Sequence, residues 1–511
     1  MINSLTREPV ARALVLSSDN RFATFTDDQG HFEFQFPSTN PVQLMARKPG
    51  FLEFGNSGFY QSQTAVAEDM TVALIPEALI VGRVNLPSSN QFDRITVQVY
   101  KRQVRDGRPF WAPAASAATR SNGEFRVANL AAGTYKVFTS ELLDRDPISF
   151  DPAGQLYGYP PIYYPAASDF ASASAITLEA GKTFQVELSP VLQPYYPVKI
   201  AVTNIAAGSA LNVSVATQGH KGPGYSLGFT SDPAIEGMLP NGTYTVEATL
   251  QQGLQTATGG VTITVKDAPL IHTSLALLPD SVIPVNIKDE LSDHQERTVL
   301  KQGVFSREQK AEVFLQAADD FDSTGDASLR PPRKPNDNDL VLENVRPGRY
   351  WLNVSPYRGY VASAVAGSVD LLRQPLIVGP GGASPPIDIV LRDDSAAIEG
   401  TVEGMPAALS SARETASVGP APGPVTPYVY CIPLPDSAGR FTVSGISAEG
   451  AFQLQQLPPG LYRVLAFDRQ QGELEYQNAE AMEAYEGKGP IVRLAPGQTQ
   501  QVRVALISTK E

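Results

Sequence analysis

The chain has 511 residues, which predicts about three to five domains rather than one core. Its 40 basic and 53 acidic side chains give a formal net charge of −13, which disfavours a nucleic-acid partner. The single cysteine, Cys431, excludes an internal disulfide framework and a cysteine-rich zinc site, and no apolar run approaches a membrane span. The 41 glycines and 42 prolines, beside 42% hydrophobic residues, indicate a folded and turn-rich chain.

The N-terminal region carries no visible export signal, because residues 1–18 contain only the short apolar run 13–16. Residues 3–10 have the composition of a turn that precedes a strand at 13–17. We therefore expect an N-terminally trimmed form of a longer, exported precursor, in which domain one lacks its first strand. A complete cytoplasmic protein is the alternative.

One signature occurs four times along the chain. An aliphatic residue, two small or turn-forming residues, a glycine and a tyrosine recur at 130–135, 239–244, 345–350 and 457–462. The tyrosines lie about 110 residues apart, the length of a whole sandwich domain rather than of a solenoid repeat. We expect each glycine to adopt a backbone angle that other residues resist. Each tyrosine is expected to form a tyrosine corner, with its ring in the core and its hydroxyl bonded to nearby backbone. A degenerate copy at 32–46, which lacks the tyrosine, brings the predicted number of domains to five.

Alternating apolar residues predict strands through most of the chain, as at 95–99, 211–215, 261–265, 387–391 and 502–506. Edge hairpins are expected at 176–188 and 492–506. The one expected helix is 478–485, with Asn478 as its N-cap and with Glu480 and Glu483 on its outer face. Residues 306–320 fit either a helix or a strand, and we assign the second half to a strand.

Several segments resemble the carboxypeptidase regulatory-like domain, namely 26–34 followed by 47–51, 121–137 and 452–467. The resemblance covers domains one, two, four and five, whereas domain three matches only around 239–246. Residues 163–181 and 475–497 are similar to segments of large exported proteins of soil bacteria that carry several such domains. The resemblance implies an all-β chain of immunoglobulin-like or prealbumin-like sandwiches, with a transthyretin-like or starch-binding-like fold. No zinc peptidase domain accompanies these segments in this chain.

The expected domains are 1–76, 77–193 with a Tyr-rich insertion, the divergent 194–279, 280–394 with an acidic loop, and 395–511. Short linkers are expected near 75–78, 190–197, 278–280 and 393–396. Together these features favour a rod of five sandwiches, and a compact five-lobed body is left open.

Residues 224–228 fit the Gly-x-Ser-x-Gly elbow, with Ser226 as nucleophile and His220 as the nearest histidine. No helical pattern follows, so a loop or edge serine is the preferred interpretation. His31, His220, His272 and His294 occur singly, without the spacing of a catalytic zinc site. We therefore expect no catalytic residue, no cofactor and no enzymatic activity.

Residues 320–325 match the first half of a calcium loop, with Asp320, Asp322 and Thr324 as oxygen ligands. Position twelve of that loop is Pro331 instead of the bidentate glutamate. An acidic solvated loop is the preferred interpretation, and a structural calcium is the alternative.

Aromatic side chains stack on sugar rings, and this chain has a group of candidates in domain two. Tyr157, Tyr159, Tyr163 and Tyr164 lie in the insertion, Tyr195 and Tyr196 follow it, and Trp111 lies in a proline-flanked segment interpreted as a loop. The preferred interpretation of the tyrosines is packing between domains two and three. For Trp111, a binding lip and a loop cover are both left open.

The sequence thus favours a non-catalytic scaffold or adhesion protein, extracellular or in the cell envelope, whose surface loops bind a protein or a polysaccharide. The alternative is a carbohydrate-binding protein that uses the aromatic residues of domain two. An accessory part of a hydrolase ranks third.

Overall fold

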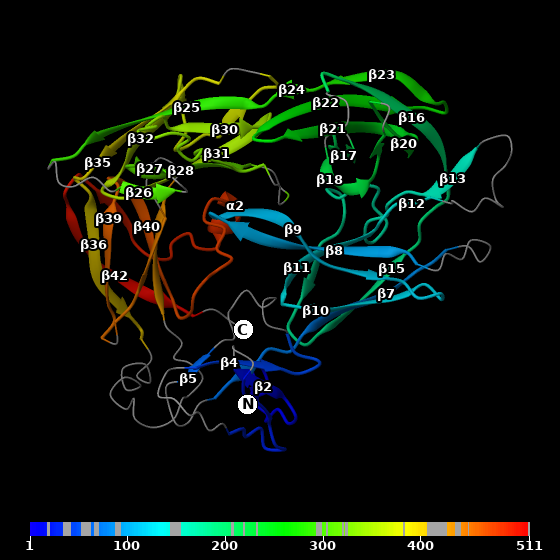
Figure 1. Cartoon of the computed structure of the whole chain (residues 1–511). Coiled ribbons are helices and arrows are strands. Elements are labelled where there is room, and N and C mark those ends of the chain that lie inside the picture. The colour runs from blue at the N-terminus through cyan, green and yellow to red at the C-terminus, as the bar shows by residue number, and fades with distance from the viewer. Residues whose placement is uncertain are drawn as a thin grey trace.

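The structure is a computed structural model of the chain (Figure 1). It describes residues 1–17, 21–33, 42–52, 63–65, 71–86, 94–143, 155–205, 209–217, 220–230, 233–292, 299–302, 305–318, 321, 325–381, 384–405, 427–434, 441–447 and 449–508. Strands form nearly all of its regular structure, and the one helix among these residues is α2 (Ala479–Glu483). The predicted all-β class with a short helix near the C-terminus is confirmed. No helix in the described residues has the length and apolar character needed to cross a membrane.

Five hydrophobic cores follow one another along the chain. They draw their buried residues from 1–74, 78–188, 198–277, 283–391 and 396–504. We call the strands around each core a module and number the modules one to five in chain order. The β-sandwich array predicted from the repeated signature is confirmed.

The strands of modules one and two have these bounds: β1 (Ile2–Asn3), β2 (Leu14–Ser17), β3 (Ala23–Phe25), β4 (Val42–Arg47), β5 (Gln63–Ala65), β6 (Ala73–Leu74); β7 (Ala78–Val84), β8 (Thr96–Arg105), β9 (Arg108–Ala118), β10 (Glu124–Leu130), β11 (Gly133–Thr139), β14 (Ile176–Leu178) and β15 (Thr183–Leu188). In module two, the sheet β10-β7-β15 and the sheet β14-β11-β8-β9 enclose the core. Side chains that alternate between buried and exposed on β7 and β15 give each sheet one apolar face.

The strands of module three are β16 (Gln193–Thr203), β17 (Leu211–Thr217), β18 (His220–Tyr225), β19 (Gly228–Phe229), β20 (Ala234–Pro240), β21 (Gly242–Gln252), β22 (Gln255–Val265), β23 (Leu270–Ala276) and β24 (Leu278–Pro279). Two short strands from the tyrosine-rich insertion, β12 (Leu142–Leu143) and β13 (Leu156–Tyr159), extend one of its sheets, because β13 pairs with β16. The insertion therefore joins modules two and three through main-chain hydrogen bonds.

Module four contains β25 (Ser281–Glu290), β26 (Val299–Gln302), β27 (Phe305–Glu308), β28 (Ala311–Ala317), β29 (Ala327–Ser328), β30 (Val341–Val345), β31 (Gly348–Pro356), β32 (Tyr360–Ala366), β33 (Val369–Asp370), β34 (Leu376–Val378) and β35 (Ile387–Arg392). Module five contains β36 (Ala396–Glu403), β37 (Tyr428–Pro433), β38 (Thr442–Gly445), β39 (Ala451–Leu457), β40 (Gly460–Phe467), β41 (Ile491–Leu494) and β42 (Thr499–Ile507) beside α2. The strand β28 confirms the assignment made for the second half of residues 306–320.

The first strand of each module pairs in parallel with the last strand, or in module three with the last strand but one: β1 with β6, β7 with β15, β16 with β23, β25 with β35, and β36 with β42. Two parallel strands run in the same direction, so the chain enters and leaves a module at opposite ends. This pairing suits modules that follow one another in a row.

The predicted tyrosine corners are present in modules two to five. The hydroxyl of each tyrosine donates to the carbonyl oxygen four residues upstream, as Tyr135 does to Ala131 at 2.7 Å and Tyr462 does to Pro458 at 2.6 Å. Tyr244 and Tyr350 make the same bond at 2.9 Å each. All four rings lie in module cores, so the signature places one satisfied phenol in each sandwich.

The expectation for the glycine of the signature is wrong in three copies. Only Gly133 of these four glycines has a positive φ, 151°. At Gly242 the constraint is space instead, because a Cβ there would lie 2.8 Å from the hydroxyl oxygen of Tyr244. The left-handed residue lies four positions before the glycine, at Asn129, Asn344 and Gln456, with φ of 59°, 58° and 57°. Irregular strand register at these places shows that each forms a β-bulge.

The predicted N-cap position of the helix is confirmed, whereas a side-chain cap is not formed. Asn478 has the extended backbone of an N-cap, but its side chain makes no capping hydrogen bond. Its Nδ2 donates instead to Glu475 Oε2 at 2.6 Å. Glu480 and Glu483 are exposed, as expected.

The modules do not form the rod that the sequence predicted. Figure 1 shows them arranged around a closed curve, with the hairpin β8–β9 reaching from module two across the centre toward α2 of module five. The hairpin also contacts module four, since Trp111 of β9 forms an isolated bridge with Phe321. Side-chain contacts between modules distant in sequence favour this closed arrangement.

Candidate functional site

The hairpin β8–β9 is the element that positions the candidate site. Its strands pair from Thr96–Ala118 to Arg105–Arg108, and Asp106 and Gly107 form the turn with φ of 48° and 72°. Two positive φ values in succession are typical of the tight turns that match strand twist. The long ladder lets a two-residue tip extend away from its own module.

The structure corrects the predicted loop around Trp111, which lies within β9 opposite Arg102. Proline is tolerated in a strand at a sheet edge because the missing N–H faces away from the neighbouring strand. The strand β9 is the edge of its sheet, and it accommodates Pro109 and Pro113.

The hairpin is fastened to module five by charged and main-chain contacts. Both terminal nitrogens of Arg102 hydrogen-bond the carboxylate of Glu475, with Nη2 at 2.8 Å from Oε2. Lys101 Nζ lies 3.5 Å from Glu473 Oε1. At the tip, the carbonyl of Gly107 accepts a hydrogen bond from the N–H of Gln477 at 3.1 Å. Because only 9% of the Glu475 side chain is exposed, the Arg102 pair is shielded from solvent.

Module four holds the other side of the hairpin. The guanidinium of Arg108 lies 3.7 Å from the centroid of the Trp351 ring. Arg105 Nη1 lies 3.7 Å from Asp326 Oδ2. A guanidinium over an indole is the most favourable cation–π geometry, so Arg108 and Trp351 add attraction where the two modules meet.

An aromatic cluster lies farther along the same face of the hairpin. Phe170 of the insertion packs edge-on against Phe321 of module four, with ring centroids 4.8 Å apart. Lys136 is buried among these rings, and its Nζ donates to the carbonyl of Phe170 at 2.7 Å. Burial lowers the pKa of Lys136, while Asp169 opposes that shift. The cluster therefore ties module two to module four through apolar contacts.

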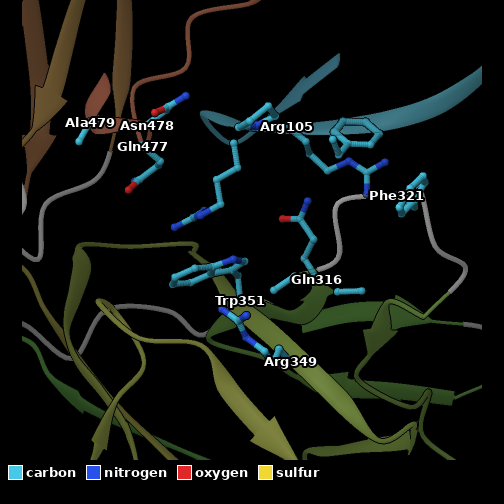
Figure 2. A pocket seen from close by; sticks show the side chains of 13 residues that line it. Arg105, Gln316, Phe321, Arg349, Trp351, Gln477, Asn478 and Ala479 are labelled. Atoms are coloured by element: carbon cyan, nitrogen blue, oxygen red, sulfur yellow. The ribbon is translucent and has the colours of Figure 1, made fainter. Parts of the chain in front are cut away.

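These contacts enclose a cavity of about 390 Å³ between modules two, four and five. The lining residues carry three guanidinium groups, three primary amides and three aromatic rings beside smaller apolar groups: Arg105, Arg108, Pro109, Phe110, Gln316, Ala317, Ala318, Phe321, Arg349, Trp351, Gln477, Asn478 and Ala479. Figure 2 shows side chains from all three modules converging on this space. None of these lining residues is acidic, although the chain as a whole carries a net charge of −13. We call this cavity the junction pocket.

Strand geometry explains how module four contributes its part of the junction pocket. Arg349 and Trp351 alternate with the core residue Tyr350 on β31, so both point away from the core. Gln316 of β28 is directly opposite Trp351 in the register, and its Oε1 accepts from Asn353 Nδ2 at 3.1 Å.

The arginines of the junction pocket differ in their surroundings. Burial lowers the pKa of Arg108, against the opposing effects of Tyr476 and Asp106. Arginine remains charged in proteins, so Arg108 keeps its positive charge there. Arg349 is exposed and, among the described residues, forms no ion pair. The pocket thus holds positive charge that the described part of the chain leaves partly uncompensated.

The predicted aromatic candidates lie mostly inside the protein. Tyr159 and Tyr163 are 2% and 4% exposed, and Tyr163 stacks on Phe138 with centroids 4.9 Å apart. Tyr164 packs edge-on against Phe184. Tyr157 is the exception, with 47% of its surface exposed. A sugar-binding platform made of all four rings would require rearrangement of the core.

The remaining tyrosines and Trp111 also have packing roles. Tyr195 is 1% exposed, and the hydroxyl of Tyr196 donates to Asp267 Oδ1 at 3.1 Å. Trp111 lies edge-on to Phe170 in the aromatic cluster, at 5.5 Å between centroids. Ligand binding by these residues stays a prediction.

The serine motif lies in a strand-to-strand connection. Ser226 is exposed between β18 and β19, and its hydroxyl lies 3.5 Å from Glu141 Oε2. The elbow motif requires a strand-to-helix turn, which this position lacks.

The calcium candidates Asp320, Asp322 and Thr324 fall outside the described residues, so calcium binding stays a prediction. Among the residues that are described, no group of three His, Cys, Asp or Glu side chains is placed to hold a metal ion.

No residue of the junction pocket was predicted from the sequence to bind a ligand, and Asn478 was singled out only as the N-cap of the helix. One local signal was available: three arginines flank the Asp106-Gly107 turn, at 102, 105 and 108. That pattern indicates a basic hairpin tip, but it does not identify the surface on which the tip docks.

No protein-family model and no curated protein sequence matches this chain. Among solved structures, the Bacillus anthracis TIE protein is similar at 10% identity over 92% of this chain and 71% of that one, with a TM-score of 0.15. A streptococcal ancillary pilin matches at 12% identity over 62% of this chain and 99% of its own, with a TM-score of 0.19. The pilus protein RrgB of Streptococcus pneumoniae matches at 10% identity over 85% and 98% of the two chains, with a TM-score of 0.16. Likeness at this level assigns no function, and the resemblance to the carboxypeptidase regulatory-like domain stays a prediction.

Proposed function

We propose that this chain is a non-catalytic recognition scaffold, extracellular or in the cell envelope, which binds a protein or a polysaccharide at surfaces formed between its modules. The observation that carries the proposal is the docking of hairpin β8–β9 on both module four and module five. A chain that served only as a spacer would need contacts between neighbouring modules alone. Contacts between distant modules instead hold loops from three modules in one fixed arrangement, which is the condition for a preorganised binding surface.

Two further observations support recognition rather than catalysis. The serine motif lies on an exposed connection between strands and lacks the geometry of a nucleophile elbow. The junction pocket is lined by arginines and amides, which bind and orient anionic or polar groups but are poor proton acceptors near neutral pH.

The test is to measure binding and turnover on the same panel of neutral and acidic polysaccharides and surface proteins. We expect the protein to bind at least one member of the panel and to release no reaction product from any of them. Product release that Ser226→Ala abolishes would overturn the proposal. Retention that persists unchanged after the hairpin is detached by Arg102→Ala with Gly107→Val would also contradict it, because binding would then not depend on the arrangement of modules.

A further inference from the structure

The chemistry of the junction pocket restricts the kind of ligand that it can hold. Arg105 and Arg108 come from module two, and Arg349 comes from module four, so positive charge approaches the cavity from two sides. A guanidinium presents paired N–H donors that match a planar carboxylate in a bidentate manner. Among the described residues the lining has three arginines and no acidic side chain, and only Arg105 of the three lies within 4 Å of a described carboxylate, that of Asp326. Such a lining is complementary to an anion.

The amides of the pocket add a second requirement. Gln316 from module four, and Gln477 and Asn478 from module five, carry both donors and acceptors. Within the described part of the chain, Gln316 Nε2 and the side chain of Gln477 make no protein hydrogen bond. Figure 2 shows Gln316 and Gln477 on different sides of the space above Trp351. Groups that both donate and accept suit hydroxyls better than they suit a bare anion.

The volume and the aromatic walls agree with a ring-shaped ligand. A cavity of about 390 Å³ falls at the lower end of the range for small-molecule sites. Phe110 and Trp351 supply apolar surface next to the arginines, although one face of each ring is covered by a guanidinium, that of Arg105 over Phe110 at 4.5 Å and that of Arg108 over Trp351 at 3.7 Å. The rest of each ring is the surface available to a ligand. Sugar rings bear C–H faces that pack on such aromatic surfaces.

An extended acidic peptide fits the pocket less well. Peptides commonly bind by adding a strand to an open sheet edge. The strand β9 is an edge strand, but Trp111 on it already forms a bridge with Phe321, and Pro109 and Pro113 lack the N–H groups that an added strand would need. The polar groups that remain for a ligand belong to side chains. A carboxylate on a hydroxylated ring uses these groups more completely than a peptide main chain does.

We infer that the junction pocket binds a uronate unit of an acidic polysaccharide, with the arginines at its carboxylate and the amides at its hydroxyls. This inference rests on the proposed recognition function and names the class of ligand. The uronate is held by side chains from modules two, four and five, so its binding depends on the docked hairpin.

The experiment is isothermal titration calorimetry of the full chain with trigalacturonate, neutral galactotriose, hexaglutamate and inorganic phosphate. We expect binding of trigalacturonate, weaker binding at higher salt, and no measurable binding of galactotriose. Arg349→Gln should weaken trigalacturonate binding at least about tenfold, since one charge-assisted contact is lost. The matched control is Arg493→Gln, an exposed arginine on β41 that does not line the pocket and whose loss should leave affinity unchanged.

Four results would overturn the inference. They are equal affinity for galactotriose, tighter binding of hexaglutamate or phosphate, no binding of any probe, and full affinity in both Arg349→Gln and Arg108→Gln. Using two variants separates loss of the ligand contact from loss of folding, because Arg349 is exposed while Arg108 also packs on Trp351. None of these four results would contradict the proposed scaffold function. That function is contradicted by enzymatic release of product, or by binding that persists after the hairpin is detached.

Discussion

Arg102 and Glu475 lie 373 positions apart in the sequence and form a paired, shielded hydrogen bond between modules two and five. Glu475 also accepts from Asn478 Nδ2, so the same carboxylate orders the start of α2 beside the pocket. One residue thereby couples the docking of the hairpin to the position of the pocket amides.

Replacing Arg102 with alanine should loosen this junction. Glu475 would lose its cationic partner in a shielded site, for which we expect a loss of about 1–3 kcal/mol in the free energy of unfolding. Urea denaturation measures the loss, and small-angle scattering should show a larger radius of gyration. The control is Lys288→Ala, which breaks an exposed pair with Glu290 and should leave the free energy of unfolding unchanged.

Two turn glycines offer a matched test of the docked hairpin tip. Gly107 and Gly253 both have positive φ, 72° and 60°, so alanine at either position incurs a backbone cost of about 1 kcal/mol. A Cβ at Gly107 would also lie 2.6 Å from the Tyr476 ring, whereas nothing lies within 4 Å at Gly253. We expect Gly107→Ala, and not Gly253→Ala, to expand the particle in scattering. Equal effects of the two substitutions would mean that the tip does not dock on module five.

Removing one tyrosine-corner hydroxyl should destabilise its module without changing the fold. Tyr462→Phe leaves the carbonyl of Pro458 without its donor in a buried site, which costs about 1–2 kcal/mol. The matched control is Tyr157→Phe, because Tyr157 is exposed. Urea denaturation monitored by circular dichroism of the backbone measures the stability of both variants. An unchanged midpoint for Tyr462→Phe would contradict the corner.

Stability should fall at alkaline pH because of buried tyrosines. Burial raises the pKa of Tyr225 to about 12, and burial together with Asp394 raises the pKa of Tyr360 to about 12. The unfolded chain ionises these phenols near pH 10 and then binds fewer protons than the folded chain. Their contribution is therefore complete below about pH 10 and is lost as pH rises toward 12. Urea midpoints across this range should drop, and Tyr225→Phe should make the drop shallower.

The sequence predicted the features that depend on local pattern. Repeated glycine and tyrosine positions indicated the sandwiches, and the hydroxyls of Tyr135 and Tyr462 bond as expected. In module four it misidentified the strained residue, since Asn344 rather than Gly348 has the left-handed backbone, in the bulge before the corner. A bulge depends on the register between two strands, which residue type alone does not reveal.

The junction pocket was beyond the reach of sequence patterns. Its parts come from β8, β9, β28, β31 and the start of α2, and each part looks like an ordinary polar surface in its own module. The docking of the hairpin, with Arg102 on Glu475 and Arg108 on Trp351, brings them together. Contacts between modules that lie far apart in the sequence produce no periodic pattern of residues. The predicted rod was wrong because no such pattern indicated these contacts.

Zero-length carbodiimide cross-linking followed by mass spectrometry tests the closed arrangement most directly. Lys101 Nζ and Glu473 Oε1, on modules two and five, lie 3.5 Å apart, and the carboxylate is 65% exposed. Lys199 and Glu236, both in module three, lie 2.7 Å apart and serve as the internal control. We predict that both pairs form an amide in the monomer, and that Gly107→Val suppresses only the first. Recovery of the Lys199–Glu236 link without the Lys101–Glu473 link would show that the hairpin is undocked and would contradict the account.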